Sequence, residues 1–440
     1  MTNQNGSEAR TGKGRNMEKE KEIGRAEAIG SLLVMPMLSE GDLGALLDAS
    51  EPWSVDTPDL SIGVREMFGA DGTLLTACRR VRAAEFNRLL FGPRADSTIL
   101  VNGAPENTLD LGDLIVYVFR TGVAFACAAL TCARIELLAD ISHPGYAEGD
   151  ARYRFAGEPE DFPLETRIED VLESLGLRSF YGRGSLFLEA FVYISALVPA
   201  RFPTLEEIRD RTFRLHKMAA MDQPVADLSE EDVSYVYAAM DQTLGSYRWG
   251  CCISTTTISY VSADPEMDFA AELESQIRDG LPLAVLALYE KYTCLHFGRV
   301  LSRNMSAKNN RRQVRELKRR MLEFKAYGTV GEAMISRWHN VRMIYAHLLD
   351  CFGVERSIQE LSDKLEILSD AQKETEEART NALMTGITIF GIISILDSLL
   401  SIYEVIVNGN TAEWLMLRVS VAVIALLFMG FLLLVRGRRK

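Results

Sequence analysis

The strongest constraint on this chain is an apolar run near its C-terminus. Residues 415–435 form a stretch of 21 residues with a single charged side chain, Arg418. An α-helix of this length is about 31 Å long, which matches a bilayer core of roughly 30 Å. The residues that follow, 436–440, include four positive charges, which are retained on the cytoplasmic side of a membrane. The run therefore predicts a transmembrane helix with its carboxyl end in the cytoplasm.

A second apolar run lies just upstream, at residues 382–407. It is long enough to span a bilayer, although two carboxylates interrupt it, and an amphipathic helix on a soluble surface is the alternative. The linker at residues 408–413 has turn-forming residues and no Lys or Arg, as expected of an external loop. The two runs predict a transmembrane hairpin, about 382–407 and 415–435, with both termini in the cytoplasm. We thus expect a multi-pass protein of the inner membrane.

The first of these runs has polar side chains at helical spacing. Asp397 and Glu404 are seven residues apart, which places them on one face of an α-helix. A carboxylate inside a bilayer is costly unless it faces water or a partner. One chain with two spans cannot enclose a pore, so the polar face predicts self-association around a pore; hydrogen bonding within a non-conducting anchor is the alternative. The predicted pore-lining residues are Thr388, Ser394, Asp397, Ser401, Glu404 and Asn408.

The residues before the membrane runs divide by composition. Residues 1–27 are polar and mixed in charge, and they predict a disordered arm. Short apolar runs bounded by turn residues then predict an α/β cytosolic domain over residues 28–277. Helical periodicity from Met267 onward predicts long cytosolic or stalk helices over residues 278–380, and residues 381–440 hold the two spans and the basic tail. We expect the stalk to continue without a break into the first span.

Three apolar stretches of the body need separate interpretation. Residues 114–132 are apolar enough for a third membrane span, but their β-branched and aromatic residues and the central Gly122 favour a β-hairpin. Residues 253–261 predict a single strand. Residues 281–300 are apolar nearly all round, which is typical of a buried helix.

A basic stretch follows this helix. Residues 306–325 contain eight Lys or Arg and two Glu. In a monomer the stretch would be a solvated helix face, whereas in a ring of subunits it would form a positive collar able to hold an anionic ligand. The predicted contacts to such an anion or nucleotide are Arg311, Arg312, Arg315, Lys318 and Arg319.

Composition and motifs argue against several other classes of protein. The 48 Lys and Arg against 61 Asp and Glu give a net charge of −13, which argues against direct nucleic-acid binding. The chain has no Walker A, Rossmann, HExxH or GxSxG motif, and its Cys and His residues show no metal-binding spacing. We therefore expect no enzyme. The expected ligands are divalent cations as transported ions or a nucleotide, with no resident cofactor indicated.

The order of an α/β body, a long helix, two closely spaced spans and a basic tail resembles the CorA-like family of metal-ion transporters. The resemblance covers residues 280–440. It implies a homopentameric funnel whose first span lines the pore and whose external loop begins with Tyr-Gly-Met-Asn. Ile402 and Tyr403 match the approach to this signature, but residues 404–406 are Glu-Val-Ile instead of Gly-Met-Asn. The departure argues against magnesium selectivity.

A divergent branch of that family, found beside type III CRISPR systems, is similar in length and also lacks the signature. The apolar-aromatic helix at residues 286–301, LALYEKYTCLHFGRVL, is similar in style to the helix before the stalk in that branch. This resemblance implies a membrane effector of antiviral defence that a nucleotide second messenger activates. Three hypotheses follow: a cation channel gated by its cytosolic domain, the nucleotide-activated effector, and a non-conducting membrane anchor for a binding domain.

Overall fold

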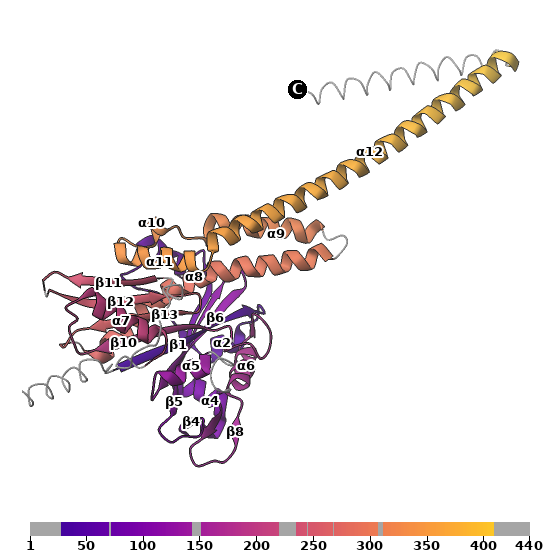
Figure 1. Cartoon of the computed structure of the whole chain (residues 1–440). Coiled ribbons are helices and arrows are strands. Elements are labelled where there is room, and N and C mark those ends of the chain that lie inside the picture. Colours follow the sequence, from indigo (N-terminus) through magenta and orange to yellow (C-terminus); the bar gives the residue numbers. More distant parts are fainter. Residues whose placement is uncertain are drawn as a thin grey trace, which may run out of the picture. The chain divides into compact units, whose positions relative to one another are not determined.

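The computed structural model describes residues 28–69, 72–142, 151–219, 235–243, 245–266, 268–306 and 311–408 (Figure 1). It has a mixed α/β sheet domain followed by a helical C-terminal region, so the α/β prediction for the body is confirmed. The chain divides into two compact units, Met1–Asp363 and Lys364–Lys440. The predicted arm at 1–27 and the predicted second span at 415–435 lie outside the described residues.

A single large sheet organises the first unit. Its strands are β1 (Ala28–Ser39), β2 (Glu51–Pro52), β3 (Leu75–Val81), β4 (Ile99–Val101), β5 (Thr108–Phe119), β6 (Val123–Cys132), β7 (Tyr153–Phe155), β8 (Asp161–Phe162), β9 (Leu177–Ser179), β10 (Phe191–Val198), β11 (Tyr235–Asp241), β12 (Ser246–Ile253) and β13 (Thr257–Ala263). The main path is β11-β12-β13-β10-β1-β6-β5-β4-β7-β8, and β2, β3 and β9 pair at its sides. Neighbours run antiparallel, except that β10 and β13 are parallel.

Helices lie between and after the strands. They are α2 (Gly44–Asp48), α3 (Ile62–Phe68), α4 (Ala83–Phe91), η1 (Gly92–Arg94), α5 (Glu136–Ser142), α6 (Leu164–Ser174), α7 (Leu205–His216), α8 (Phe269–Ser306), α9 (Arg311–Glu323), η3 (Phe324–Gly328), α10 (Glu332–Ile335), α11 (His339–Cys351) and α12 (Val354–Asn408). The helical periodicity predicted from Met267 onward corresponds to α8.

The apolar stretch at 114–132 is a β-hairpin, as predicted, and not a membrane span. Strands β5 and β6 pair in antiparallel register, and Gly122 has a φ of +88° in the turn between them. Both strands are buried over most of their length. Helices cover both faces of the sheet, so the residues of this stretch are apolar whichever face they point to.

The prediction of one strand over 253–261 was wrong. Strand β12 ends at Ile253 and β13 begins at Thr257, so the stretch contains the turn of a hairpin. The hydroxyl of Ser254 accepts a hydrogen bond from the backbone N–H of Thr257 at 3.2 Å. Ser and Thr hydroxyls stabilise such turns through local hydrogen bonds, which outweigh the strand preference of the Thr residues.

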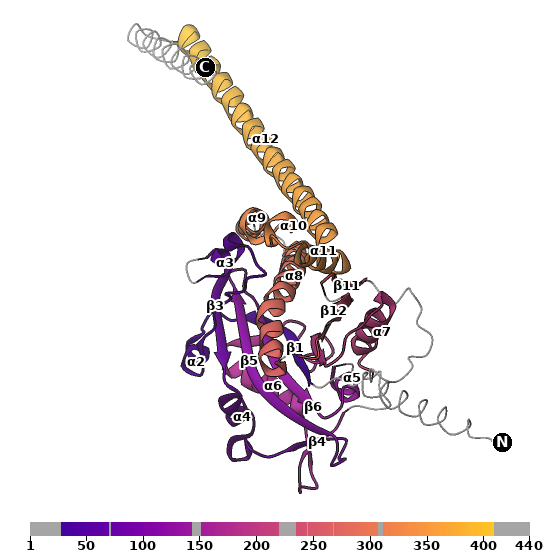
Figure 2. The ribbon, with the colours of Figure 1, turned by 90° about the vertical axis from the view of Figure 1, so that its left-hand side faces the viewer.

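The two faces of the sheet have different partners. Alternate residues of β1, such as Leu33 and Met35, join a core with Phe86 of α4 and Leu172 of α6. Helix α8 packs on β1, β6 and β10, and Figure 2 shows it crossing the sheet. There Tyr289 of α8 stacks on Phe119 of β5 with ring centroids 3.9 Å apart. Residues Leu283 to Tyr289 are all buried, which confirms the predicted buried helix.

Between residues 328 and 381 the chain forms α10, α11 and the first part of α12. Helix α11 ends at Cys351, and α12 begins at Val354 after Gly353, whose φ is +60°. A left-handed Gly is a common helix stop. From Val354 the helix continues without interruption to Asn408, which confirms that the stalk and the first apolar run form one helix.

A buried carboxylate connects α8 to the segments that precede α12. Glu290 is 3% exposed, and its Oε1 accepts hydrogen bonds from the backbone N–H of Val330 at 2.9 Å and the hydroxyl of Tyr345 at 2.8 Å. Burial raises the pKa of Glu290 to about 7, although both hydrogen bonds oppose the shift. Tyr345, on α11, is fully buried and makes the direct link between the two helices.

We predict that Tyr345→Phe lowers the free energy of unfolding by about 1–2 kcal/mol, because a buried acceptor loses one of its donors. The measurement is thermal unfolding of the full chain in detergent, followed by circular dichroism. The matched control is Tyr327→Phe, since Tyr327 is 64% exposed and its substitution should leave the midpoint unchanged. Equal midpoints for the two variants would contradict a stabilising role for the Glu290–Tyr345 hydrogen bond.

Candidate functional site

The C-terminal part of α12 is apolar and uncovered. Residues Thr380–Glu404 make up the one candidate membrane span within the part of the chain that the structure describes, and none of its apolar window is buried. Ile387 is 71% exposed and Phe390 is 78% exposed. Single exposed apolar residues are ordinary, but a continuous run of them marks a surface that lipid or another chain covers.

Several hydroxyl groups of this segment donate to backbone carbonyls of the same helix. Thr388 donates to the carbonyl of Met384 and Ser398 to the carbonyl of Ser394, each at 2.8 Å. Such back-bonding lets a hydroxyl reside in an apolar environment without an unpaired donor. The hydroxyls of Thr388 and Ser398 therefore require no water-filled pore.

The two carboxylates of the segment have no comparable partner among the described residues. Asp397 and Glu404 are exposed, and no described side chain pairs with either of them. At about 100° per residue, Ser394, Ser401 and Glu404 lie within a third of a turn of Asp397. Thr388, nine positions before Asp397, falls on the opposite side of the helix, so the predicted pore-lining residues do not share one face. Asn408 ends the helix, and its side chain lies outside the described atoms.

The basic stretch is a surface of α9. Arg319 pairs with Glu316 and Glu323 of the same helix, and Arg320 donates to Glu316 at 3.0 Å. Hydrogen bonds from the two arginines lower the pKa of Glu316 to about 2. Arg315 and Lys318 are exposed, whereas the side chains of Arg311 and Arg312 are outside the described atoms. The charge of Arg319 is therefore compensated within α9.

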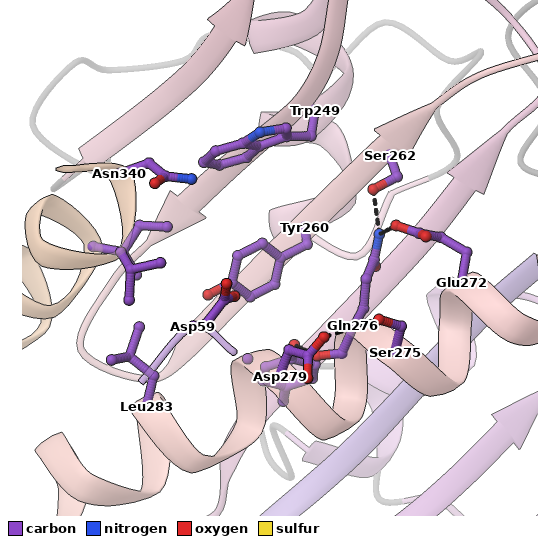
Figure 3. Close-up of a pocket in the computed structure, with 14 residues that line it drawn as sticks. Asp59, Trp249, Tyr260, Ser262, Glu272, Ser275, Gln276, Asp279, Leu283 and Asn340 are labelled. Atoms are coloured by element: carbon purple, nitrogen blue, oxygen red, sulfur yellow. Dashed lines mark hydrogen bonds between the residues drawn. The ribbon is translucent and has the colours of Figure 1, made fainter. Parts of the chain in front are cut away.

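A pocket that the sequence analysis did not predict lies between the sheet, α8 and α11 (Figure 3). Its volume is about 210 Å³. We call it the acidic-aromatic pocket and define it by the lining residues Asp59, Tyr193, Trp249, Tyr260, Gln276 and Asp279. Glu272 and Ser275 of α8 and Asn340, Val341 and Ile344 of α11 also line it.

Helix α8 supplies the polar side of the pocket. Glu272, Gln276 and Asp279 recur at positions i, i+4 and i+7, so they share one face of the helix. This face is close to the sheet because Gly280 has no side chain: a Cβ there would be 2.3 Å from the Tyr193 hydroxyl. That hydroxyl donates to the backbone carbonyl of Gln276 at 2.7 Å.

The charge of the pocket is negative. Asp279 accepts hydrogen bonds from Ser275 at 2.9 Å and from Arg278 at 3.1 Å. The carboxylate of Asp59 has no hydrogen-bond or ion-pair partner among the described residues, and it points toward Tyr260 in Figure 3. Burial, and then the charge of Asp279, raise the pKa of Asp59 to about 6. No Lys or Arg is among the described residues that line the pocket.

One side-chain atom of Gln276, next to the pocket, has no partner among the described residues. The side-chain amide nitrogen of Gln276 donates to Glu272 at 3.3 Å and also contacts Ser262. Its oxygen, Oε1, is buried and has no hydrogen-bond partner in the described chain. Because Oε1 is buried, a ligand in the pocket does not reach it while the Gln276 side chain holds this position.

Comparisons with known proteins give no relative: no protein family, no curated protein and no solved structure matches the chain.

We predict that Asp59→Asn stabilises the protein above pH 6 by about 1 kcal/mol, after allowance for the partial exposure of Asp59. A raised pKa means that the folded chain retains a proton that the unfolded chain releases, so the carboxylate costs stability as the pH rises from about 4 to about 6. The groups that face it are Asp279 on α8, Tyr193 on β10 and Tyr260 on β13.

The measurement is the unfolding midpoint between pH 4.5 and 7.5 in an amine-free buffer. The gain from Asp59→Asn should grow with pH and level off above pH 6. Asp48→Asn, at an exposed position of α2, is the control and should give no gain. A gain that is the same at pH 4.5 and 7.5 would mean that the ionisation of Asp59 does not limit stability.

Proposed function

We propose that the chain is a homo-oligomeric protein of the inner membrane that conducts cations. Its cytosolic α/β domain gates this conduction. The observation that carries this proposal is the continuity of α12. One helix begins at Val354, next to the folded domain, and includes the uncovered apolar segment Thr380–Glu404. A membrane is the environment that stabilises such a segment, and the helix connects it directly to the domain.

The carboxylates support conduction of cations over simple anchoring. Asp397 and Glu404 lie on one face of α12, whereas the rest of the surface there is largely apolar. Lipid can cover the apolar surface, but the carboxylates require water or a partner. When several copies turn this face inward, the two carboxylates form stacked rings that concentrate cations. The pentameric, CorA-like funnel with a two-span hairpin is the assembly that we propose.

The connection between α11 and α12 supports gating. Helix α11 carries Tyr345, which is tied to Glu290 of α8, and it is followed by α12 after Gly353. A ligand that favours one position of α11 over another would change the equilibrium between conformations of α12. Divalent cations are the transported ions that we propose, without selectivity for magnesium.

A nucleotide-activated effector of type III CRISPR antiviral defence is the second candidate. The exposed Arg315 and Lys318 of α9 favour it, since several copies would bring their positive charges to one collar. The intrahelical pairing of Arg319 and the negative charge of the acidic-aromatic pocket weigh against it. A non-conducting anchor is the third, and it predicts neither a ring of copies nor ion flux.

We predict that the full chain reconstituted in liposomes carries K⁺ and Mg²⁺, and that Asp397→Asn reduces the flux at least fivefold. The reason is that neutralising one carboxylate per copy removes a whole ring of negative charge. Asp370→Asn, a change of the same kind on α12 but outside the candidate span, is the control and should retain most of the flux. The oligomeric mass of both variants should equal that of the unmodified chain.

Equal flux through Asp397→Asn and the unmodified chain would remove Asp397 from the conduction mechanism. Absence of flux together with a monomeric mass would leave the anchor as the function of the apolar segment.

A further inference from the structure

The acidic-aromatic pocket has no role in conduction itself, and its composition restricts what it can bind. Three carboxylates line it, from Asp59, Glu272 and Asp279, and no Lys or Arg is among the described lining residues. Arg278 pairs with Asp279 and so compensates one of these charges. A phosphate or carboxylate ligand would meet uncompensated negative charge at close range, so the pocket disfavours anions.

A metal ion also fits the pocket poorly. No group of three His, Cys, Asp or Glu residues within the described ranges is arranged to hold one. Hard divalent cations take six or more oxygen ligands, whereas much of this lining is aromatic or aliphatic, from Trp249, Tyr260, Leu283 and Ile344. The pocket thus combines negative charge with apolar surface.

That combination suits an ammonium group on an organic stem. Aromatic faces attract cations through the ring quadrupole, and this attraction grows when water is excluded. The carboxylate of Asp59, which has no partner among the described residues, supplies the opposite charge. A protonated amine supplies both the positive charge and the N–H donors. The volume, about 210 Å³, is below the range of about 300–1,000 Å³ typical of larger ligands.

We propose that the acidic-aromatic pocket binds a small organic cation, a protonated amine on a short apolar stem, and that its occupancy controls α11. The ammonium group lies beside the Asp59 carboxylate and the ring of Tyr260, and the stem contacts Leu283 of α8 and Ile344 of α11. Since α11 also lines the pocket through Asn340 and Val341, the ligand bridges this helix to α8 and the sheet. The regulatory half of this inference rests on the proposed function, because α11 leads into α12.

Binding is tested with n-butylamine, the uncharged analogue 1-butanol and adenosine monophosphate. Each is titrated into the full chain in detergent at pH 7.5 in amine-free cacodylate buffer, and the readouts are Trp fluorescence and the unfolding midpoint. We expect n-butylamine to bind once per chain and at least tenfold more tightly than 1-butanol. Asp59→Asn should weaken amine binding at least tenfold, and this variant should fold because it removes an unpaired charge.

Glu274→Gln is the matched control, since Glu274 is an exposed residue of α8 outside the pocket, and it should bind the amine as the unmodified chain does. Equal affinity for the amine and the alcohol, or equal amine affinity in Asp59→Asn and Glu274→Gln, would overturn the site. If adenosine monophosphate binds more tightly than the amine and this binding is lost in Asp59→Asn, the ligand of the pocket is a nucleotide and the proposed organic cation is wrong.

Regulation is tested by flux through liposomes with and without n-butylamine on the side of the α/β domain. We expect the amine to change the flux at least twofold in the unmodified chain and not in Asp59→Asn. Amine binding with unchanged flux would overturn the proposal that the ligand controls α11, while the binding site itself would stand. Amine binding to a chain that conducts no ions at all would instead contradict the proposed function.

Discussion

The apolar part of α12 is covered by none of the residues that the structure describes, and the rest of the molecule's proposed function depends on this exposure. A helix of a soluble protein buries its apolar surface against its own fold, whereas Thr380–Glu404 is exposed throughout its apolar window. The same helix begins at Val354 beside the sheet domain. The environment that covers the apolar segment is therefore linked to the domain through one continuous helix. Asp397 and Glu404 require water or a partner on their side of that helix.

Two features lie at α8 and α11, which precede that helix in the chain: a hydrogen-bonded buried carboxylate and a pocket. Glu290 accepts hydrogen bonds from Val330 and Tyr345, and so fixes α11 on α8 through groups that are costly to separate. The acidic-aromatic pocket lies between the same two helices and the sheet, and its Asp59 carboxylate has no partner among the described residues. The Glu290 hydrogen bonds are satisfied within the fold and stabilise the helix pair, whereas the pocket is the place where we propose that a ligand acts.

The sequence predicted elements whose cause is local and missed those whose cause is tertiary. The β5–β6 hairpin, the buried α8 and the continuity of α12 follow from residue type, Gly122 and periodicity. The prediction of one strand over residues 253–261 failed because the hydroxyl of Ser254 stabilises a turn there. Composition also could not show that Arg319 pairs within α9. The pocket brings together Asp59, Trp249 and Asp279, which are distant in sequence. The one sign of it in the sequence is the helical spacing of Glu272, Gln276 and Asp279.

The most direct test of the central claim is the mass and symmetry of the full chain in lipid nanodiscs, measured by mass photometry and imaging of single particles. We predict a closed ring of copies, five in the CorA-like assembly, with α12 of each copy around a central axis and Asp397 facing that axis. A monomer, or a ring in which the carboxylates face lipid, would contradict the account, because a single chain cannot enclose a pore and a carboxylate is not stable against hydrocarbon.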